Sequence, residues 1–119
     1  MIKNRMPTRF YSTRQEKAVA KAINGKRTPN SGAAKFTGGD IITDQFLIEA
    51  KTSTAEKQSF SIKKAWLEKN EEERFAMGKQ YSALVFDFGD NGNRYYVIDE
   101  PLFIRLTELM KIENTDKER

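Results

Sequence analysis

Residues 40–51 have the sequence DIITDQFLIEAK, and this stretch determines the fold that we expect. Two mainly apolar runs flank a polar Asp-Gln pair, which is the pattern of two strands joined by a tight turn. Alternate side chains of a strand share a face, so Glu49 and Lys51 lie on one face and the apolar residues of that strand form the other. If the strands pair through this turn, Asp40 lies almost opposite Glu49.

The segments on either side predict helices and further strands. Thr13 and Glu16 match a capping box followed by apolar residues, and Gly25 ends that pattern, which predicts a helix. Ser61 is placed to cap a second helix, and the nearly all-apolar run after this helix indicates a buried strand. The expected elements are a helix over 13–24, a short extended piece near 26–29, strands over 40–43 and 46–51, a helix over 61–77, strands over 83–88 and 94–99, and a helix over 101–112. This order predicts an α/β (α+β) fold in which helices flank a central mixed β-sheet.

The composition limits the chemistry that the chain can perform. It has no Cys and no His, which excludes disulfides, thiolate zinc sites and histidine general bases. Any reaction must use Asp, Glu, Lys, Ser, Thr or Tyr, or a metal ion held by oxygen atoms. Oxygen ligands favour hard ions, so we expect Mg²⁺, for which Mn²⁺ can substitute.

Length and charge indicate one domain with a nucleic-acid partner. The 119 residues fit a single domain over 1–119. No run of roughly 18 apolar residues and no signal-peptide core is visible, so we expect a cytoplasmic protein that does not enter a membrane. Residues 1–36 hold nine Lys or Arg and one acid, whereas residues 37–119 hold twelve Lys or Arg and sixteen acids. A basic arm over 1–12 is typical of phosphate binding or of a solubilising segment, and a charged tail over 113–119 ends the chain.

Asp40, Glu49 and Lys51 are the central candidates for catalysis. Two carboxylates that face each other repel unless a cation lies between them, so this pair could hold Mg²⁺. Lys51 could then orient or deprotonate a water beside a phosphate. The alternative is a solvated acid next to an exposed Glu-Lys ion pair, which contributes about 0–1 kcal/mol to stability.

Two interpretations of Glu16 stay open. As the third residue of a capping box it can bond back to the start of its helix. It also begins the apolar stripe of that helix, so its carboxylate is expected to point inward, where an acid needs a partner. A metal ion shared with Asp40 and Glu49 would be such a partner.

Other residues are candidates for contact with DNA. The loop around Ser31 and Lys35 carries hydroxyl, amide and ammonium groups that could hold a phosphate, although it also fits an ordinary linker. The remaining basic candidates are Arg9, Arg14, Lys26 and Arg27. Trp66 fits the core better than a base-stacking surface. Asn70 and Arg74 share its helical stripe, which leaves contact with a second subunit or with DNA open.

With these residues in place, the chain resembles the PD-(D/E)xK nuclease superfamily, and more narrowly the archaeal-type Holliday junction resolvases that phages also carry. The resemblance covers about residues 9–105, and Gly39 stands where the family signature usually has Pro. The matching segments are Arg14-Gln15-Glu16, Asn30-Ser31-Gly32, Gly39-Asp40-Ile41 and Ile48-Glu49-Ala50-Lys51.

This resemblance implies a restriction-endonuclease-like core and a Mg²⁺-dependent hydrolysis that leaves a 5′-phosphate. It implies Asp40, Glu49 and Glu16 as metal residues and Lys51 as the residue that positions the nucleophile. It also implies a homodimer with two active sites that cuts symmetric strands of branched DNA. The alternatives are a nuclease for nicked, flapped or linear DNA on the same core, and a DNA-binding module without catalysis.

Overall fold

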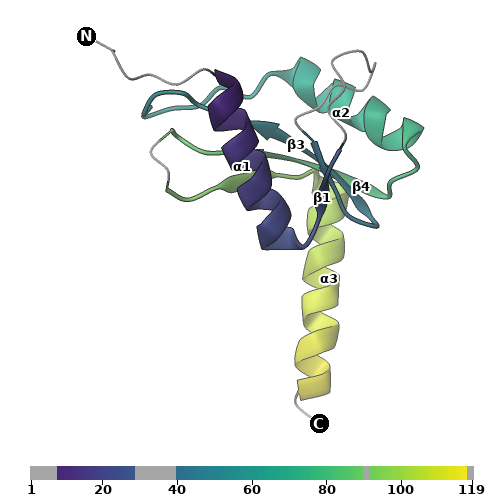
Figure 1. The fold of residues 1–119 in the computed structure, drawn as a ribbon. Coiled ribbons are helices and arrows are strands. Elements are labelled where there is room, and N and C mark those ends of the chain that lie inside the picture. Colours follow the sequence, from purple (N-terminus) through teal and green to yellow (C-terminus); the bar gives the residue numbers. More distant parts are fainter. Residues whose placement is uncertain (1–7, 29–39, 90–91, 118–119) are drawn as a thin grey trace.

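The computed structural model describes residues 8–28, 40–89 and 92–117 of the chain. These described residues form three helices and five strands (Figure 1). In chain order the elements are α1 (Thr8–Ile23), β1 (Lys26–Arg27), β2 (Asp40–Ile42), β3 (Phe46–Lys51), α2 (Lys64–Ala76), β4 (Tyr81–Phe86), β5 (Tyr95–Val97) and α3 (Glu100–Lys117).

The strands form one mixed sheet in the order β1-β2-β3-β4-β5. The β3–β4 pair is parallel and the other pairs are antiparallel. Helix α2 is the crossover between the two parallel strands, as parallel pairing requires. The register places Asp40 opposite Glu49, so the predicted hairpin is confirmed. The expected mixed sheet with flanking helices is confirmed as well, whereas the restriction-endonuclease-like core stays a prediction.

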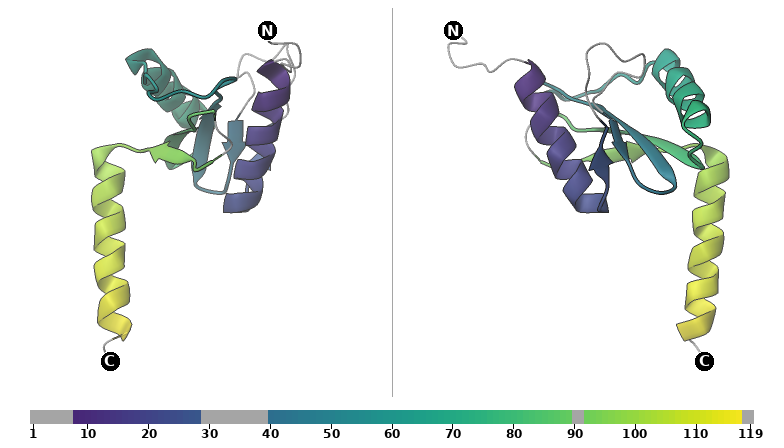
Figure 2. Two further views of the ribbon diagram at one scale, coloured as in Figure 1. Left: turned by 90° about the vertical axis from the view of Figure 1, so that its left-hand side faces the viewer. Right: turned by 45° about the vertical axis from the view of Figure 1, so that its right-hand side comes forward.

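Helices α1 and α2 lie on opposite faces of the sheet (Figure 2). On the α1 face, Val19 packs in a buried cluster with four sheet residues, which are Ile41, Ile48, Ala83 and Val85. The alternate residues of β3, which are Leu47, Glu49 and Lys51, therefore face α2, and this helix packs against β3 and β4. This alternation places the cluster around Val19 on the α1 side and leaves Glu49 and Lys51 on the α2 side, together with the fully buried Leu47 and Leu84.

Several element boundaries differ from those expected. Helix α1 begins at Thr8 and not at residue 13, so residues 8–12 of the expected arm belong to a helix. The capping-box assignment is therefore wrong, because Thr13 and Glu16 lie inside α1. The expected cap at Ser61 is also wrong, since α2 begins at Lys64 after Lys63, whose side chain makes no capping bond.

The strand and helix ends nearer the C-terminus shift as well. Strand β4 begins and ends two residues earlier than expected, and β5 covers Tyr95–Val97 only. Helix α3 continues to Lys117, so part of the charged segment expected as a tail is helical. None of the helices in the described ranges is long and apolar enough to cross a membrane.

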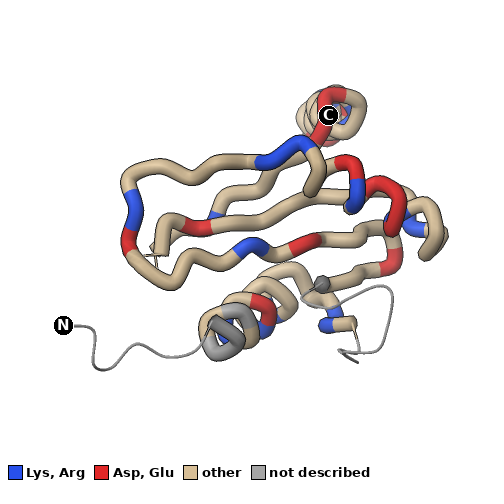
Figure 3. Tube along the Cα trace, turned by 90° about the horizontal axis from the view of Figure 1, so that it is seen from above, with Lys and Arg blue, Asp and Glu red and all other residues tan. Residues whose placement is uncertain are grey.

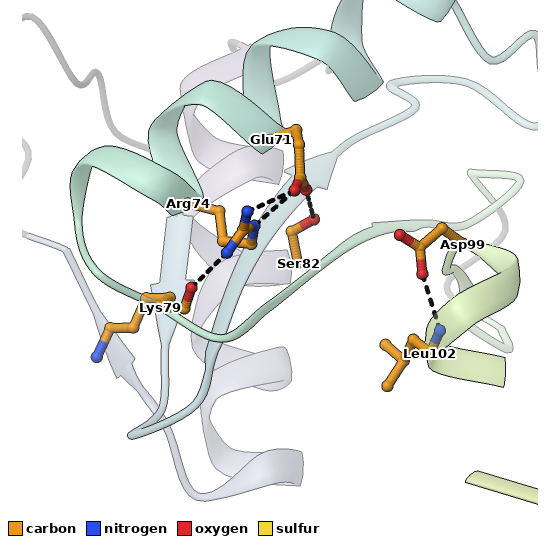
Figure 4. A network of polar contacts seen from close by, with 6 residues as sticks. All are labelled: Glu71, Arg74, Lys79, Ser82, Asp99 and Leu102. Atoms are coloured by element: carbon orange, nitrogen blue, oxygen red, sulfur yellow. Dashed lines mark hydrogen bonds and ion pairs between the residues drawn. The ribbon is translucent and has the colours of Figure 1, made fainter. Parts of the chain in front are cut away.

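Polar contacts hold the C-terminal end of α2 against β4 (Figure 4). The Arg74 guanidinium lies 2.7 Å from Glu71 Oε1 and donates to the Lys79 carbonyl at 2.7 Å. Ser82 donates to the other Glu71 oxygen at 3.0 Å. These contacts, the Arg74 hydrogen bond first, hold the pKa of Glu71 below its usual value. Arg74 is therefore engaged within its own subunit.

Asn70 also faces the sheet. Its side chain is buried, and its Nδ2 donates to the Ala83 carbonyl at 3.0 Å. This amide satisfies a backbone oxygen inside the chain, and contact of Asn70 with a second subunit or with DNA stays a prediction.

Helix α3 projects from the edge of the sheet into solvent (Figure 2). Asp99 accepts a hydrogen bond from the Leu102 N–H at 3.0 Å and so caps its first turn (Figure 4). Leu102 is buried, but the turns beyond it expose large apolar side chains. These are Phe103, Ile104, Leu106, Leu109, Met110 and Ile112.

Candidate active site

The catalytic candidates lie where β2 begins and β3 ends. These strands are antiparallel, so the first residue of β2 and the last residues of β3 meet at one edge of the sheet. The backbone of Asp40 is described and pairs with Glu49, whereas its side chain lies outside the described part. Strand pairing thus brings Asp40, Glu49 and Lys51 together at the backbone level, as the sequence predicts.

Glu49 and Lys51 form an ion pair on the α2 face of β3. Lys51 Nζ lies 3.0 Å from Glu49 Oε2, and the two side chains are 25% and 13% exposed. The other carboxylate oxygen, Oε1, is buried and has no hydrogen-bond partner among the described residues. Buried polar atoms are normally paired. Glu49 therefore has one oxygen held by an ammonium group and one buried oxygen without a partner in the described part of the chain.

The Trp66 ring supports Lys51 from α2. Lys51 Nζ lies 4.3 Å from the ring centroid, which is the geometry of a cation–π contact. Lys63 approaches the same ring at 5.7 Å. The ring is half-buried and packs against Phe60 at a centroid distance of 6.2 Å. Sequence reasoning placed Trp66 in the core but missed its contact with Lys51.

Glu73 is a second buried acid beside this pair, and sequence reasoning missed it. Its residue exposure is 6%, and it pairs with Lys69 at 4.0 Å. Burial raises the pKa of Glu73, the negative charge of Glu49 acts in the same direction, and Lys69 and Lys51 oppose both. The spacing Trp66, Asn70, Glu73 is the signal that could have found it, because residues at i, i+4 and i+7 share a helix face.

Glu16 points inward, as the apolar stripe of α1 predicts, and its partner is Arg27. Glu16 is 6% exposed, and Arg27 Nε and a terminal guanidinium nitrogen both lie 3.2 Å from Oε1. Arg27 pairs in the sheet with Ile41, one residue from Asp40. Because Ile41 packs against α1, Glu16 and Arg27 lie on the α1 face of the sheet, whereas Glu49 and Lys51 lie on the α2 face. The role of Glu16 as a metal residue stays a prediction.

Gln15 joins α1 to the end of β3, and sequence reasoning gave it no role of its own. Its Nε2 donates to the Lys51 carbonyl at 3.0 Å, and its Oε1 accepts from the Thr52 hydroxyl at 2.7 Å. Nε2 also lies 3.5 Å from Asp87 Oδ2. Gln15 is 6% exposed, so it fixes the backbone at Lys51 from the α1 face while Trp66 contacts the side chain from the α2 face.

The predicted DNA-binding residues are only partly described. Ser31 and Lys35 lie outside the described residues, and Arg9 belongs to α1 without a described side chain. Arg14 and Lys26 are exposed, and Arg27 is half-buried against Glu16. Figure 3 shows Lys and Arg positions interspersed with Asp and Glu positions over the sheet and helices.

The donor set fits a hard divalent cation in part. Glu49 Oε1 is a buried carboxylate oxygen without a partner in the described part of the chain, which is the ligand type that Mg²⁺ selects. Among residues 8–28, 40–89 and 92–117 no three acidic side chains gather closely enough to hold a metal ion. This finding does not cover Asp40, whose side chain lies outside the described part of the structure.

No family model, no curated protein and no solved structure matches this chain in comparisons with known proteins. The resemblance to junction-resolving nucleases therefore depends on the sequence motifs.

Proposed function

We propose that the chain is a Mg²⁺-dependent, structure-selective DNA endonuclease that resolves Holliday junctions by cutting symmetric strands. One observation carries the proposal. The register places Asp40 opposite Glu49, and Glu49 holds Lys51 at 3.0 Å while keeping a buried oxygen without a described partner. A carboxylate pair with an adjacent lysine is suited to hydrolysis of a phosphodiester beside a hard cation.

Each residue has a distinct role in this proposal. Asp40 and Glu49 would hold Mg²⁺, which supplies Lewis acidity and lowers the pKa of a bound water. Lys51 orients the attacking water and offsets negative charge at the phosphate, and Trp66 limits the positions that its ammonium can take. Glu16 supports this end of the sheet through Arg27, or contributes to the metal site directly.

A homodimer would supply the second cut. Resolution of a four-way junction requires two cuts on symmetric strands, whereas one chain carries a single Asp40–Glu49–Lys51 cluster. Helix α3 exposes six large apolar side chains, and a groove of about 500 Å³ at its base is lined by apolar residues that include Phe46, Tyr96 and Leu106. A second copy presents the same helix and groove, so a twofold pairing would cover both.

A gel assay with a four-way junction, a linear duplex and a flap, in Mg²⁺ and in EDTA, tests the proposal. Paired symmetric cuts in the junction, in Mg²⁺ only, are the expected result. Cleavage of flap or duplex in preference to the junction would replace the resolvase by another nuclease. Tight binding with no cleavage of any substrate in Mg²⁺ or Mn²⁺ would leave a DNA-binding module without catalysis.

A further inference from the structure

A polar pocket of about 210 Å³ lies between α1 and the loops that follow β3 and β4. Its lining includes Tyr11, Arg14, Gln15, Thr52, Ser53 and Arg94. Strands β3 and β4 are parallel, so their carboxyl ends open at the same edge of the sheet. The carboxyl ends of parallel strands are a frequent place for ligand binding in α/β sheets.

The floor of the pocket is held by hydrogen bonds. The Gln15 amide is fixed between the Lys51 carbonyl and the Thr52 hydroxyl. Ser53 is buried, and its hydroxyl donates to the Asp87 carbonyl at 3.3 Å. These contacts come from α1, β3 and the end of β4 and hold the floor of the pocket, whereas Gly89, Gly92 and Arg94 line it from the loop between β4 and β5.

The described part of the lining carries more positive than negative side chains. Among the described residues that line the pocket, Arg14 and Arg94 contribute guanidinium groups and Asp87 is the one acid. The Asp87 carboxylate already accepts from the Gly89 N–H at 2.9 Å, and Gln15 Nε2 lies 3.5 Å from its other oxygen. Arg14 lies 6.0 Å from the Tyr11 ring centroid. Guanidinium groups above an amide and hydroxyl floor suit an anion with several oxygen acceptors.

We propose that this pocket binds the phosphodiester that neighbours the scissile one on the same DNA strand. This assignment depends on the proposed nuclease function. Thr52 directly follows Lys51 in the chain, whereas the Lys51 ammonium lies on the α2 face and the pocket opens beside α1. A strand whose scissile phosphate lies at Lys51 would therefore pass over the end of β3 to place its neighbouring phosphate at Thr52 and Arg94. The pocket is smaller than the roughly 300–1,000 Å³ of sites for drug-sized ligands. It therefore fits a phosphate with part of its sugar better than a complete nucleotide.

The Arg94→Gln variant of the full chain tests the pocket, and Arg105→Gln is its matched control. Arg105 is an exposed arginine on α3, so this control removes the same charge away from the pocket. Equilibrium binding of a labelled four-way junction is measured in EDTA, where no cleavage occurs, at several salt concentrations. We expect Arg94→Gln to weaken binding about fivefold or more and to reduce the log–log salt slope by about one. The Arg105 variant should match the unmodified chain.

A second variant and a second ligand keep the test decisive. Arg14→Gln removes the other guanidinium and should give the same two changes. If neither pocket variant differs from Arg105→Gln while both keep the native circular dichroism spectrum, the proposal is overturned. If inorganic phosphate shifts the amide resonances of Thr52 and Arg94 while DNA affinity is independent of both arginines, the pocket binds free phosphate and the proposal is again overturned.

The outcome is separable from that of the nuclease assay. Arg94-dependent DNA binding together with no cleavage by the unmodified chain would refute the nuclease and retain a DNA phosphate site. Cleavage with Arg94-independent binding would refute the pocket and retain the nuclease.

Discussion

Replacing Gln15 by Leu should destabilise the protein, because one side chain makes two short contacts between α1 and the end of β3. The bonds to the Lys51 carbonyl and the Thr52 hydroxyl measure 3.0 and 2.7 Å, and Gln15 is 6% exposed. Leaving a buried polar group unpaired costs about 1–3 kcal/mol. Thr52 is half-buried and its hydroxyl can turn toward water, so the two losses together should amount to about 2–4 kcal/mol.

Urea titration followed by circular dichroism measures this loss. The midpoint should fall with little change in the m-value, and the melting temperature should fall by about 10 °C for a domain of this size. Gln80→Leu is the matched control, because the Gln80 side chain is exposed and its amide donates to the hydroxyl of the neighbouring Tyr81 rather than to another element. A loss below about 0.5 kcal/mol for Gln15→Leu, equal to that of the control, would refute the claim that Gln15 fixes the backbone at Lys51.

Glu71→Gln should lower the free energy of unfolding by less than about 1 kcal/mol at neutral pH. Because Arg74 holds the pKa of Glu71 below its usual value in the folded state, urea titrations should show this difference shrinking as the pH falls below 4.5. An unchanged difference at acid pH would contradict this. Glu16→Gln should reduce cleavage at least tenfold but lower stability by no more than about 1 kcal/mol, since Gln can still accept from Arg27; unaltered kinetics would restrict Glu16 to a structural role. Leu109→Glu should convert the expected dimer into a monomer in sedimentation equilibrium while leaving the fold intact, and a monomeric unmodified chain would contradict the dimer itself.

The part of the fold that sequence reasoning predicted depends on local patterns. The β2–β3 hairpin has two mainly apolar runs around a two-residue polar turn, and the Thr43 hydroxyl accepts the N–H groups of Gln45 and Phe46 at 3.3 and 3.0 Å. Register follows from turn chemistry and the period of two, so the pairing of Asp40 with Glu49 was predictable.

Helix ends were less predictable because local signals competed. Thr13 and Glu16 form a plausible cap in the sequence, yet α1 begins at Thr8 and its interior carries both residues. Helix α3 continues to Lys117 through a charged segment that composition alone assigned to a tail. Helix propensity and capping patterns are weak predictors of where a helix begins and ends, because packing can extend the helix past such a signal.

The residues missed in the site act through tertiary contacts. Gln15 lies 36 residues from Lys51 in the chain, and nothing in the local sequence indicates that its amide reaches that carbonyl. Glu73 resembles the other acids of a solvated helix, and only its packing against β3 distinguishes it from exposed Glu72. The inward direction of Glu16 was predictable from periodicity, whereas its partner Arg27 was not.

The central claim is that Asp40, Glu49 and Lys51 form a metal-dependent site for cutting DNA. The most direct measurement compares single-turnover cleavage of a labelled four-way junction, in Mg²⁺ and in EDTA, by the unmodified chain and by Asp40→Asn and Glu49→Gln, with junction affinity measured for the same samples in EDTA. We predict paired cuts by the unmodified chain in Mg²⁺ alone. Neither variant should cleave, and both should bind as tightly or more tightly, because repulsion between carboxylate and phosphate is relieved. Cleavage by Glu49→Gln at the unmodified rate would contradict the account.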